Sequence, residues 1–147
     1  MNEVIDTIGA SLFSEILAVD QLARAHIAKV LPQGMELSHF SVLNHLAYVN
    51  QERTPAQLAA SFHITRGAMT NTLNKLEWMG HIHIRPDWDD ARRILVACSP
   101  SGRAARDAAL ASLTPLLSGI VSEIGEDQAR AVVPVLREMR IKLSSAR

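Results

Sequence analysis

The stretch from Thr54 to Gly102 constrains the fold most, because two helix signals are followed directly by two strand signals. Thr54 can accept a backbone N–H as a helix cap, and Pro55 follows at the first helical position, where no N–H is needed. The side chains that should face inward from this first helix are Leu58, Ala59 and Phe62. The register then breaks at His63-Ile64, so the helix is short.

A second helix is predicted from Thr65, another N-cap residue, to about Met79. One face is an apolar stripe formed by Met69, Leu73 and Leu76. The opposite face carries hydrogen-bonding side chains and no acid before Glu77: Arg66, Thr70, Asn71, Asn74 and Lys75. With the small Gly67 and Ala68 near its start, this face suits the major groove of DNA, where base donors and acceptors lie between rows of phosphates.

A β-hairpin is predicted after Gly80, which ends the second helix. Residues 81–86 alternate, with Ile82 and Ile84 on one face and His81, His83 and Arg85 on the other. Residues 87–92 form the turn, and the inward positions of the returning strand are Ile94, Val96 and Cys98. An isolated hairpin is marginally stable, so this one must lean on the helices. Two short helices followed by a hairpin are the pattern of a winged helix-turn-helix.

Residues 37–103 resemble the MarR (multiple antibiotic resistance regulator) family of winged-helix repressors. The matching strings are Leu58-Ala59, Leu76-Glu77-Trp78-Met79-Gly80, Arg85-Pro86-Asp87-Trp88-Asp89-Asp90-Ala91-Arg92 and Ser99-Pro100-Ser101-Gly102. The wing string is specific as a whole, and Cys98 departs from the leucine that the family usually has. The resemblance implies a mainly α protein whose N- and C-terminal helices interlock into a homodimer that binds double-stranded DNA.

Long apolar helical patterns flank this segment. Residues 4–31 repeat aliphatic side chains at helical spacing, and a further helix follows with Ser38 as its expected N-cap. After Ser99-Pro100 a helix runs from about residue 101 into the 120s, and a last helix follows Gly125. Pro115 and Pro134 lie inside these two patterns and should bend them.

These terminal helices are too apolar for the surface of a monomer, so they need a partner. We therefore expect dimerisation helices at residues 1–36 and 101–147 around a DNA-binding domain at residues 37–100. The formal net charge is zero, but residues 65–106 hold seven Lys or Arg and four Asp or Glu. The positive excess thus lies on the segment expected to meet DNA, and the local field matters more for binding than the total.

Eleven residues are expected to contact DNA: Thr65, Arg66, Gly67, Thr70, Asn71, Asn74, Lys75, Arg85, Asp90, Arg92 and Arg93. Taken alone, a polar helix face is more often a solvated surface, but the wing string beside it reverses this preference in favour of DNA. Base edges are assigned to Arg66, Thr70 and Asn71, and phosphates to Asn74 and Lys75. The resemblance implies that Arg92 enters the minor groove while Asp90 helps to hold the loop, with Arg93 as a substitute or a phosphate contact.

The resemblance also implies a small aromatic acid as effector, bound between the dimerisation helices and the DNA-binding lobe. The expected wall of this site is His39, Phe40 and Leu43 together with the N-terminal helix. Metal sensing through His81 and His83 is an alternative, but no cysteine or acid pair stands at ligand spacing nearby. Cys98 is interpreted as a small core side chain rather than a redox switch.

Enzyme classes find little support, because the chain has no Gly-rich phosphate loop, nucleophile elbow or His-x-x-x-His metal helix. No cofactor is expected. The single cysteine suits a reducing compartment, and no apolar run reaches 18 residues, so a cytoplasmic protein without a membrane span is expected. The hypothesis is a homodimeric repressor released from a pseudo-palindromic operator by a small molecule. The alternative is a winged-helix interaction module without specific DNA binding.

Overall fold

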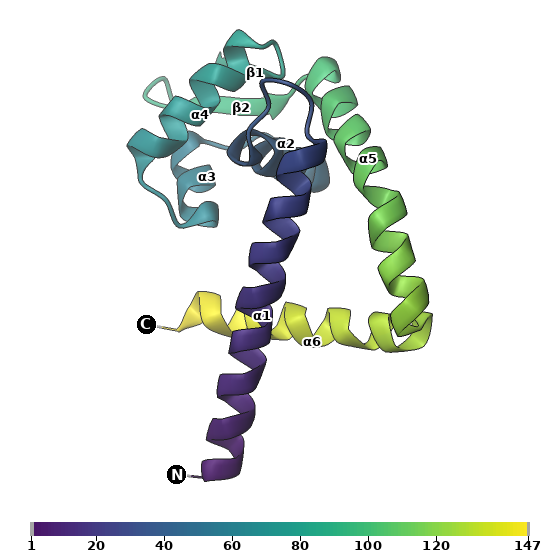
Figure 1. The fold of residues 1–147 in the computed structure, drawn as a ribbon. Helices are drawn as coiled ribbons and strands as arrows, with labels where there is room; N and C mark the ends of the chain where they lie inside the picture. Colours follow the sequence, from purple (N-terminus) through teal and green to yellow (C-terminus); the bar gives the residue numbers. More distant parts are fainter. Residues whose placement is uncertain (1, 147) are drawn as a thin grey trace. The chain divides into compact units, whose positions relative to one another are not determined.

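The computed structural model describes residues 2–146, which form six helices and a two-stranded antiparallel sheet (Figure 1). The elements are α1 (Glu3–Val30), α2 (Leu37–Val49), α3 (Pro55–Phe62), α4 (Arg66–Trp78), β1 (Ile82–Pro86), β2 (Ile94–Cys98), α5 (Pro100–Ile124) and α6 (Glu126–Ser145). The chain divides after Ser112 into two compact units, which we describe separately. The predicted fold class, mainly α with a winged helix-turn-helix, is confirmed.

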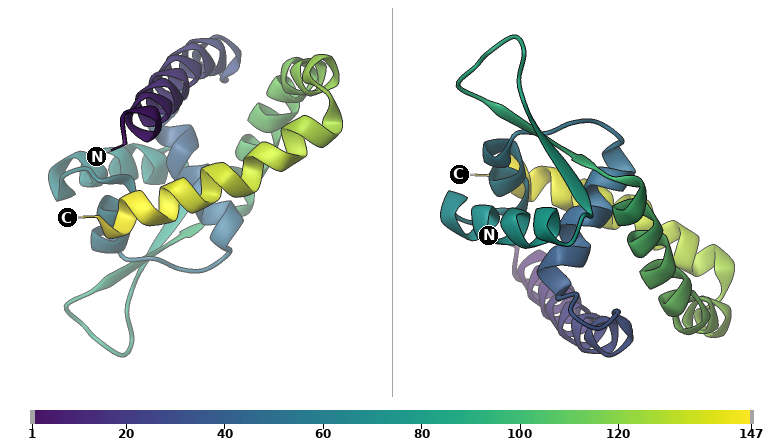
Figure 2. Two further views of the ribbon diagram at one scale, coloured as in Figure 1. Left: turned by 90° about the horizontal axis from the view of Figure 1, so that it is seen from below. Right: turned by 90° about the horizontal axis from the view of Figure 1, so that it is seen from above.

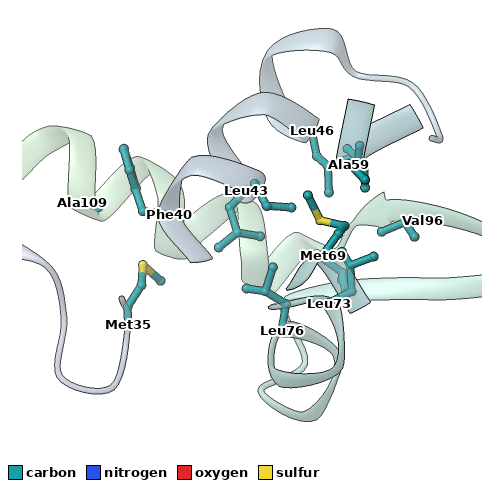
Figure 3. Close-up of a cluster of buried hydrophobic side chains, with 13 residues drawn as sticks. Met35, Phe40, Leu43, Leu46, Ala59, Met69, Leu73, Leu76, Val96 and Ala109 are labelled. Carbon is teal, nitrogen blue, oxygen red and sulfur yellow. The ribbon is translucent and has the colours of Figure 1, made fainter. Parts of the chain in front are cut away.

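The core of the first unit lies between α2, α3, α4, the sheet and the start of α5 (Figure 3). Its largest fully buried side chains come from different elements: Leu43, Leu46, Leu58, Met69, Leu76 and Val96. Of the inward positions predicted for α3 and α4, Phe62 is partly buried against this core and the others are buried: Leu58, Ala59, Met69, Leu73 and Leu76. We call residues 35–112 the head, because the buried cluster begins at Met35 and ends at Ala109.

The start of α2 differs from the prediction, which made Ser38 its N-cap. The helix begins at Leu37, after an extended Glu36, and Ser38 lies exposed in its first turn. The imidazole of His39 turns back instead, and its Nδ1 accepts the Glu36 N–H at 3.0 Å. This bond satisfies the N–H of the N-cap residue Glu36, whereas a serine N-cap at residue 38 would have accepted an N–H from within the helix.

The capping residues predicted for α3 and α4 are confirmed. Thr54 Oγ1 accepts the N–H of Gln57 at 3.1 Å, and Gln57 Oε1 accepts the N–H of Thr54 at 2.9 Å. Thr65 Oγ1 caps α4 by accepting the N–H of Ala68 at 3.1 Å. Between these helices His63 adopts a left-handed conformation with φ 53°, which ends α3 and turns the chain.

The sheet pairs Ile84 with Val96, and a short bridge from Arg53 gives Val96 a second partner. The Arg53 and Val96 backbones exchange hydrogen bonds of 3.0 and 2.7 Å. Val96 is fully buried, but Ile94 is 43% exposed although it shares the same face. The expected inward position of Ile94 is thus wrong, because β2 begins at this residue, next to the loop and outside the edge of the core. Figure 2 shows this loop projecting past the helices.

The terminal helices leave their apolar side chains exposed. α1 and α6 have no buried residue among those described, although both carry large aliphatic side chains. α5 and α6 run through Pro115 and Pro134, and Gly125 separates them with φ 106°. By length and mean hydropathy, α5 alone among the described helices could cross a membrane, although the sequence contains no uninterrupted apolar run of that length. Its N-terminal part contributes Ala109 to the core of the head.

Candidate nucleic-acid interface

The predicted polar face of α4 is exposed. Arg66, Gly67, Thr70, Asn71, Asn74 and Lys75 all lie on the surface, whereas Met69, Leu73 and Leu76 on the other side are at most 2% exposed. The hydroxyl of Thr65 is used locally as the cap of the helix. The apolar stripe therefore holds α4 against the core and leaves the polar side chains free to meet a large ligand.

The loop between the strands, residues 87–93, is closed by its own aspartates. The Asp87 carboxylate accepts the Asp89 N–H at 2.9 Å, and the Asp87 N–H donates to the Arg93 carbonyl at 3.0 Å. The N–H of Arg93 in turn donates to the Asp90 carbonyl at 3.0 Å. We call residues 87–93 the wing loop, and its path is defined by these internal bonds.

Asp90 fixes Arg92 at the tip of the wing loop. Its Oδ1 accepts the backbone N–H of Arg92 at 3.0 Å and the side-chain Nε at 3.1 Å. The hydrogen bonds from the side chain and backbone of Arg92 lower the pKa of Asp90 below its usual value. The Arg92 side chain is still 89% exposed, so the pair orients the guanidinium without covering it.

A groove of about 570 Å³ joins the wing to the starts of α3 and α4. Its lining residues are Thr54, Pro55, Ala56, Gln57, Arg66, Thr70, Arg92, Arg93 and Ile94. Three arginines line it, so we call it the arginine groove. The starts of two helices add the partial positive charge of their unpaired N–H groups. This combination of arginines and helix starts suits a polyanion.

The α3 side of the arginine groove was not among the residues predicted to bind DNA. In the sequence, Thr54 and Pro55 indicate only the start of a helix, and such residues occur at most helix starts. Their place beside Arg66 and Thr70 follows from the packing of α3 against α4 and the sheet.

Arg85 occupies a different environment from the other predicted DNA contacts. Its Nη2 and Nε each lie 2.8 Å from a different carboxylate oxygen of Glu52. Its guanidinium also lies 4.1 Å from the centre of the Trp88 ring. The hydrogen bond to Glu52 raises the pKa of Arg85 above its usual value, with further support from the nearby Asp87 and Asp89. This arginine is held within the head and is not free to reach a base.

The proposed effector wall lies inside the core rather than on an open surface. His39, Phe40 and Leu43 are 2%, 7% and 0% exposed. Burial lowers the pKa of His39, with smaller opposing and reinforcing effects of Glu36 and Lys75, so the neutral imidazole that accepts the Glu36 N–H is favoured. A ligand that contacts all three residues must therefore displace part of this packing.

The remaining candidate residues behave as ordinary structural groups. Cys98 packs against the core, and burial raises the pKa of its thiol, which disfavours the reactive thiolate. The His81 imidazole lies 3.3 Å from the Ser101 hydroxyl, while His83 is exposed. Within residues 2–146, no three His, Cys, Asp or Glu side chains are grouped closely enough to hold a metal ion.

Comparison with known proteins agrees with this geometry. A family model described as MarR family matches residues 33–93. The chain is similar to the transcriptional regulator BldR from Sulfolobus solfataricus, at 22% identity and a TM-score of 0.73 over 94% of this chain and 99% of that chain. No match is found among curated protein sequences.

Two further solved structures show the same fold. A MarR mutant from E. coli, solved with operator DNA, has 21% identity and a TM-score of 0.72 over 88% of this chain and 93% of that chain. A MepR mutant from S. aureus has 20% identity and a TM-score of 0.70 over 91% and 96% of the two chains. Residues 33–93 thus match the MarR family model, and the chain as a whole has the fold of these solved structures.

Proposed function

We propose that this protein is a DNA-binding transcriptional regulator, and that it acts as a repressor rather than an enzyme. The arginine groove carries the proposal, because it places Arg66, Arg92 and Arg93 beside the free polar face of α4. A duplex that lies across the groove would receive α4 in its major groove and the wing loop in its minor groove. The solved E. coli MarR mutant bound to operator DNA supports this assignment.

The active form is proposed to be a homodimer in the cytoplasm. Exposed aliphatic side chains along α1, α5 and α6 support a partner, because a soluble monomer rarely leaves such long apolar faces in water. A second copy provides the same faces by symmetry, and two heads then match the two half-sites of a pseudo-palindromic operator. The apolar surface of α5 is explained in the same way, as a face that the second copy covers.

The wing and α4 are expected to make different contributions to DNA binding. Arg92→Ala should weaken binding to operator and to random duplex alike, because a fixed, exposed guanidinium attracts phosphates regardless of sequence. It should also reduce the salt dependence by about one phosphate contact per protomer. Asn71→Ala should leave the salt dependence unchanged and remove about 1–3 kcal/mol of base discrimination per half-site, since an amide can pair with adenine.

Titrations of both variants at several salt concentrations, on operator and scrambled DNA, measure these two quantities. The DNA immediately upstream of the protein's own gene is the first operator to test. If Asn71→Ala retains its sequence preference, the base-reading face is wrongly assigned. If both variants bind like the parent, the proposed DNA-binding function is rejected. The alternative is then a winged-helix interaction module without specific DNA binding.

A small aromatic acid is proposed to release the protein from DNA through the region of His39, Phe40 and Leu43. Because these side chains are packed in the core of the head, binding there must rearrange α2 and so change the position of α4. An aromatic carboxylate that binds should raise the melting temperature and weaken operator binding, whereas aliphatic carboxylates of equal charge should do neither. If no member of an aromatic panel has either effect, the effector site is elsewhere.

A further inference from the structure

All three nitrogens of the Arg85 guanidinium have partners within the head. Nε and Nη2 contact the two oxygens of the Glu52 carboxylate, each at 2.8 Å, and Nη1 donates to the Pro86 carbonyl at 2.9 Å. A bidentate arginine–carboxylate pair fixes the relative orientation of its two groups as well as their distance. Glu52 and Arg85 are 33 residues apart in the chain, so the pair joins two separate segments.

The Glu52 end of this pair belongs to a well-anchored loop. The neighbouring Arg53 exchanges two backbone hydrogen bonds with Val96, whose side chain is fully buried. On the other side, the Asn50 amide accepts a hydrogen bond of 3.0 Å from Arg103 at the start of α5. The loop between α2 and α3 is thus attached both to the sheet and to α5.

The Arg85 end reaches into the wing. Trp88 lies in the wing loop, and its ring centre is 4.1 Å from the Arg85 guanidinium, the arrangement of a cation–π contact. The ring remains 82% exposed, so the core does not hold it in place. Arg85 therefore has two contacts in this region. It binds the Pro86 carbonyl at the end of β1, and it contacts Trp88 in the wing loop, which also carries Arg92.

We propose that Glu52, Arg85 and Trp88 form a clamp that positions the wing loop for DNA binding. This inference rests on the proposed function. Two strands joined by a loop are flexible, and fixing them before binding reduces the entropy lost when Arg92 and Arg93 meet DNA. Arg85 is then a positioning residue, whereas the sequence suggested a DNA contact. Glu52, although it is an acid, then promotes DNA binding because it holds Arg85.

The clamp predicts that neutralising Glu52 weakens operator binding, which is the opposite of what the loss of a negative charge alone would do. Removing a negative charge near the DNA should tighten binding if only the electrostatic field matters. Glu52→Gln should instead weaken operator binding about three- to tenfold, because one or more wing side chains must then be ordered on binding. Asp89→Asn is the matched control, since Asp89 is an exposed acid of the wing loop that acts on Arg85 only through its charge. It should tighten binding by about twofold.

Arg85→Lys gives a second test without loss of charge. Lysine cannot form the bidentate pair or the flat contact with Trp88, so this variant should lose affinity like Glu52→Gln. If Glu52→Gln and Asp89→Asn both tighten binding, and Arg85→Lys binds like the parent, Glu52 acts only through its charge and the clamp is wrong.

Hydrogen exchange of the wing amides tests the clamp without DNA. The N–H groups of Asp87 and Arg93, which bond across the wing loop, should exchange faster in Glu52→Gln than in the parent or in Asp89→Asn. The melting temperature should change little, because both side chains of the pair are about one-third exposed. Unchanged exchange in Glu52→Gln overturns the clamp, whereas faster exchange in a protein that binds no operator refutes only the proposed function.

Discussion

Gly102→Ala is expected to destabilise the head by about 3 kcal/mol or more, the largest effect of a single methyl group anticipated in this protein. A Cβ at residue 102 would lie 1.9 Å from the His81 carbonyl oxygen and 2.8 Å from its carbonyl carbon. Both are backbone atoms, so no side chain can turn away to make room. The start of α5 or the turn after α4 must move instead.

The surrounding hydrogen bonds make this movement costly. Ser99 Oγ accepts the N–H of Gly102 at 3.0 Å and donates to the Gly80 carbonyl at 2.6 Å. The Ser99 N–H donates to the same His81 carbonyl at 3.0 Å. A shift of α5 away from His81 strains this network, and Ser99 is 2% exposed, so water cannot readily replace the lost bonds.

Thermal unfolding measures the effect, which should lower the melting temperature by about 6–12 °C for a chain of this size. Gly67→Ala is the control, because a Cβ there meets only the Thr65 hydroxyl, at 4.0 Å. Alanine is the better helix former, so this variant should be stabilised by about 0.5–1 kcal/mol. Equal melting temperatures for Gly102→Ala and the parent would show that α5 does not approach the turn so closely.

The local chemistry of the helix-turn-helix could be predicted from the sequence, because each signal acts within a few residues. Thr54 and Thr65 cap their helices through bonds to residues three positions away. The stripe of α4 is buried because four- and three-residue steps bring Met69, Leu73 and Leu76 to one side. Asn50 ends α2 in the left-handed conformation, which asparagine tolerates better than most residues do.

Contacts between distant segments could not be predicted in the same way. Arg85 looked like one more arginine of a basic wing, and only folding brings Glu52 close enough to hold it. The capping of α2 was also misjudged. Serine is a common N-cap residue, but α2 already begins at Leu37, one residue before Ser38. The N–H of Glu36 is accepted by the imidazole of His39. Ile94 alternated correctly and still lies outside the core, because alternation cannot say where the core ends.

The second large effect concerns the proposed dimer, which should be lost when the exposed face of α1 receives a charge. In a single chain Val19 is 62% exposed, so a polar substitution there should change the stability by no more than about 0.5 kcal/mol. In a symmetric dimer that covers this face, Val19→Asp buries an unpaired carboxylate in each protomer. The dimer dissociation constant should then rise about a hundredfold or more, and operator binding should fall with it because two half-sites no longer share one protein.

Gln21→Asp is the matched control for this prediction. It introduces the same charge on the same helix, two residues away and therefore on roughly the opposite side. Light scattering at micromolar concentration should give twice 16.1 kDa for the parent and for Gln21→Asp, and a smaller mass for Val19→Asp. If Val19→Asp keeps the mass and the operator affinity of the parent, a second copy does not cover this part of α1. A parent protein that is itself a monomer at this concentration contradicts the dimeric architecture, and with it the reading of a pseudo-palindromic operator by two heads.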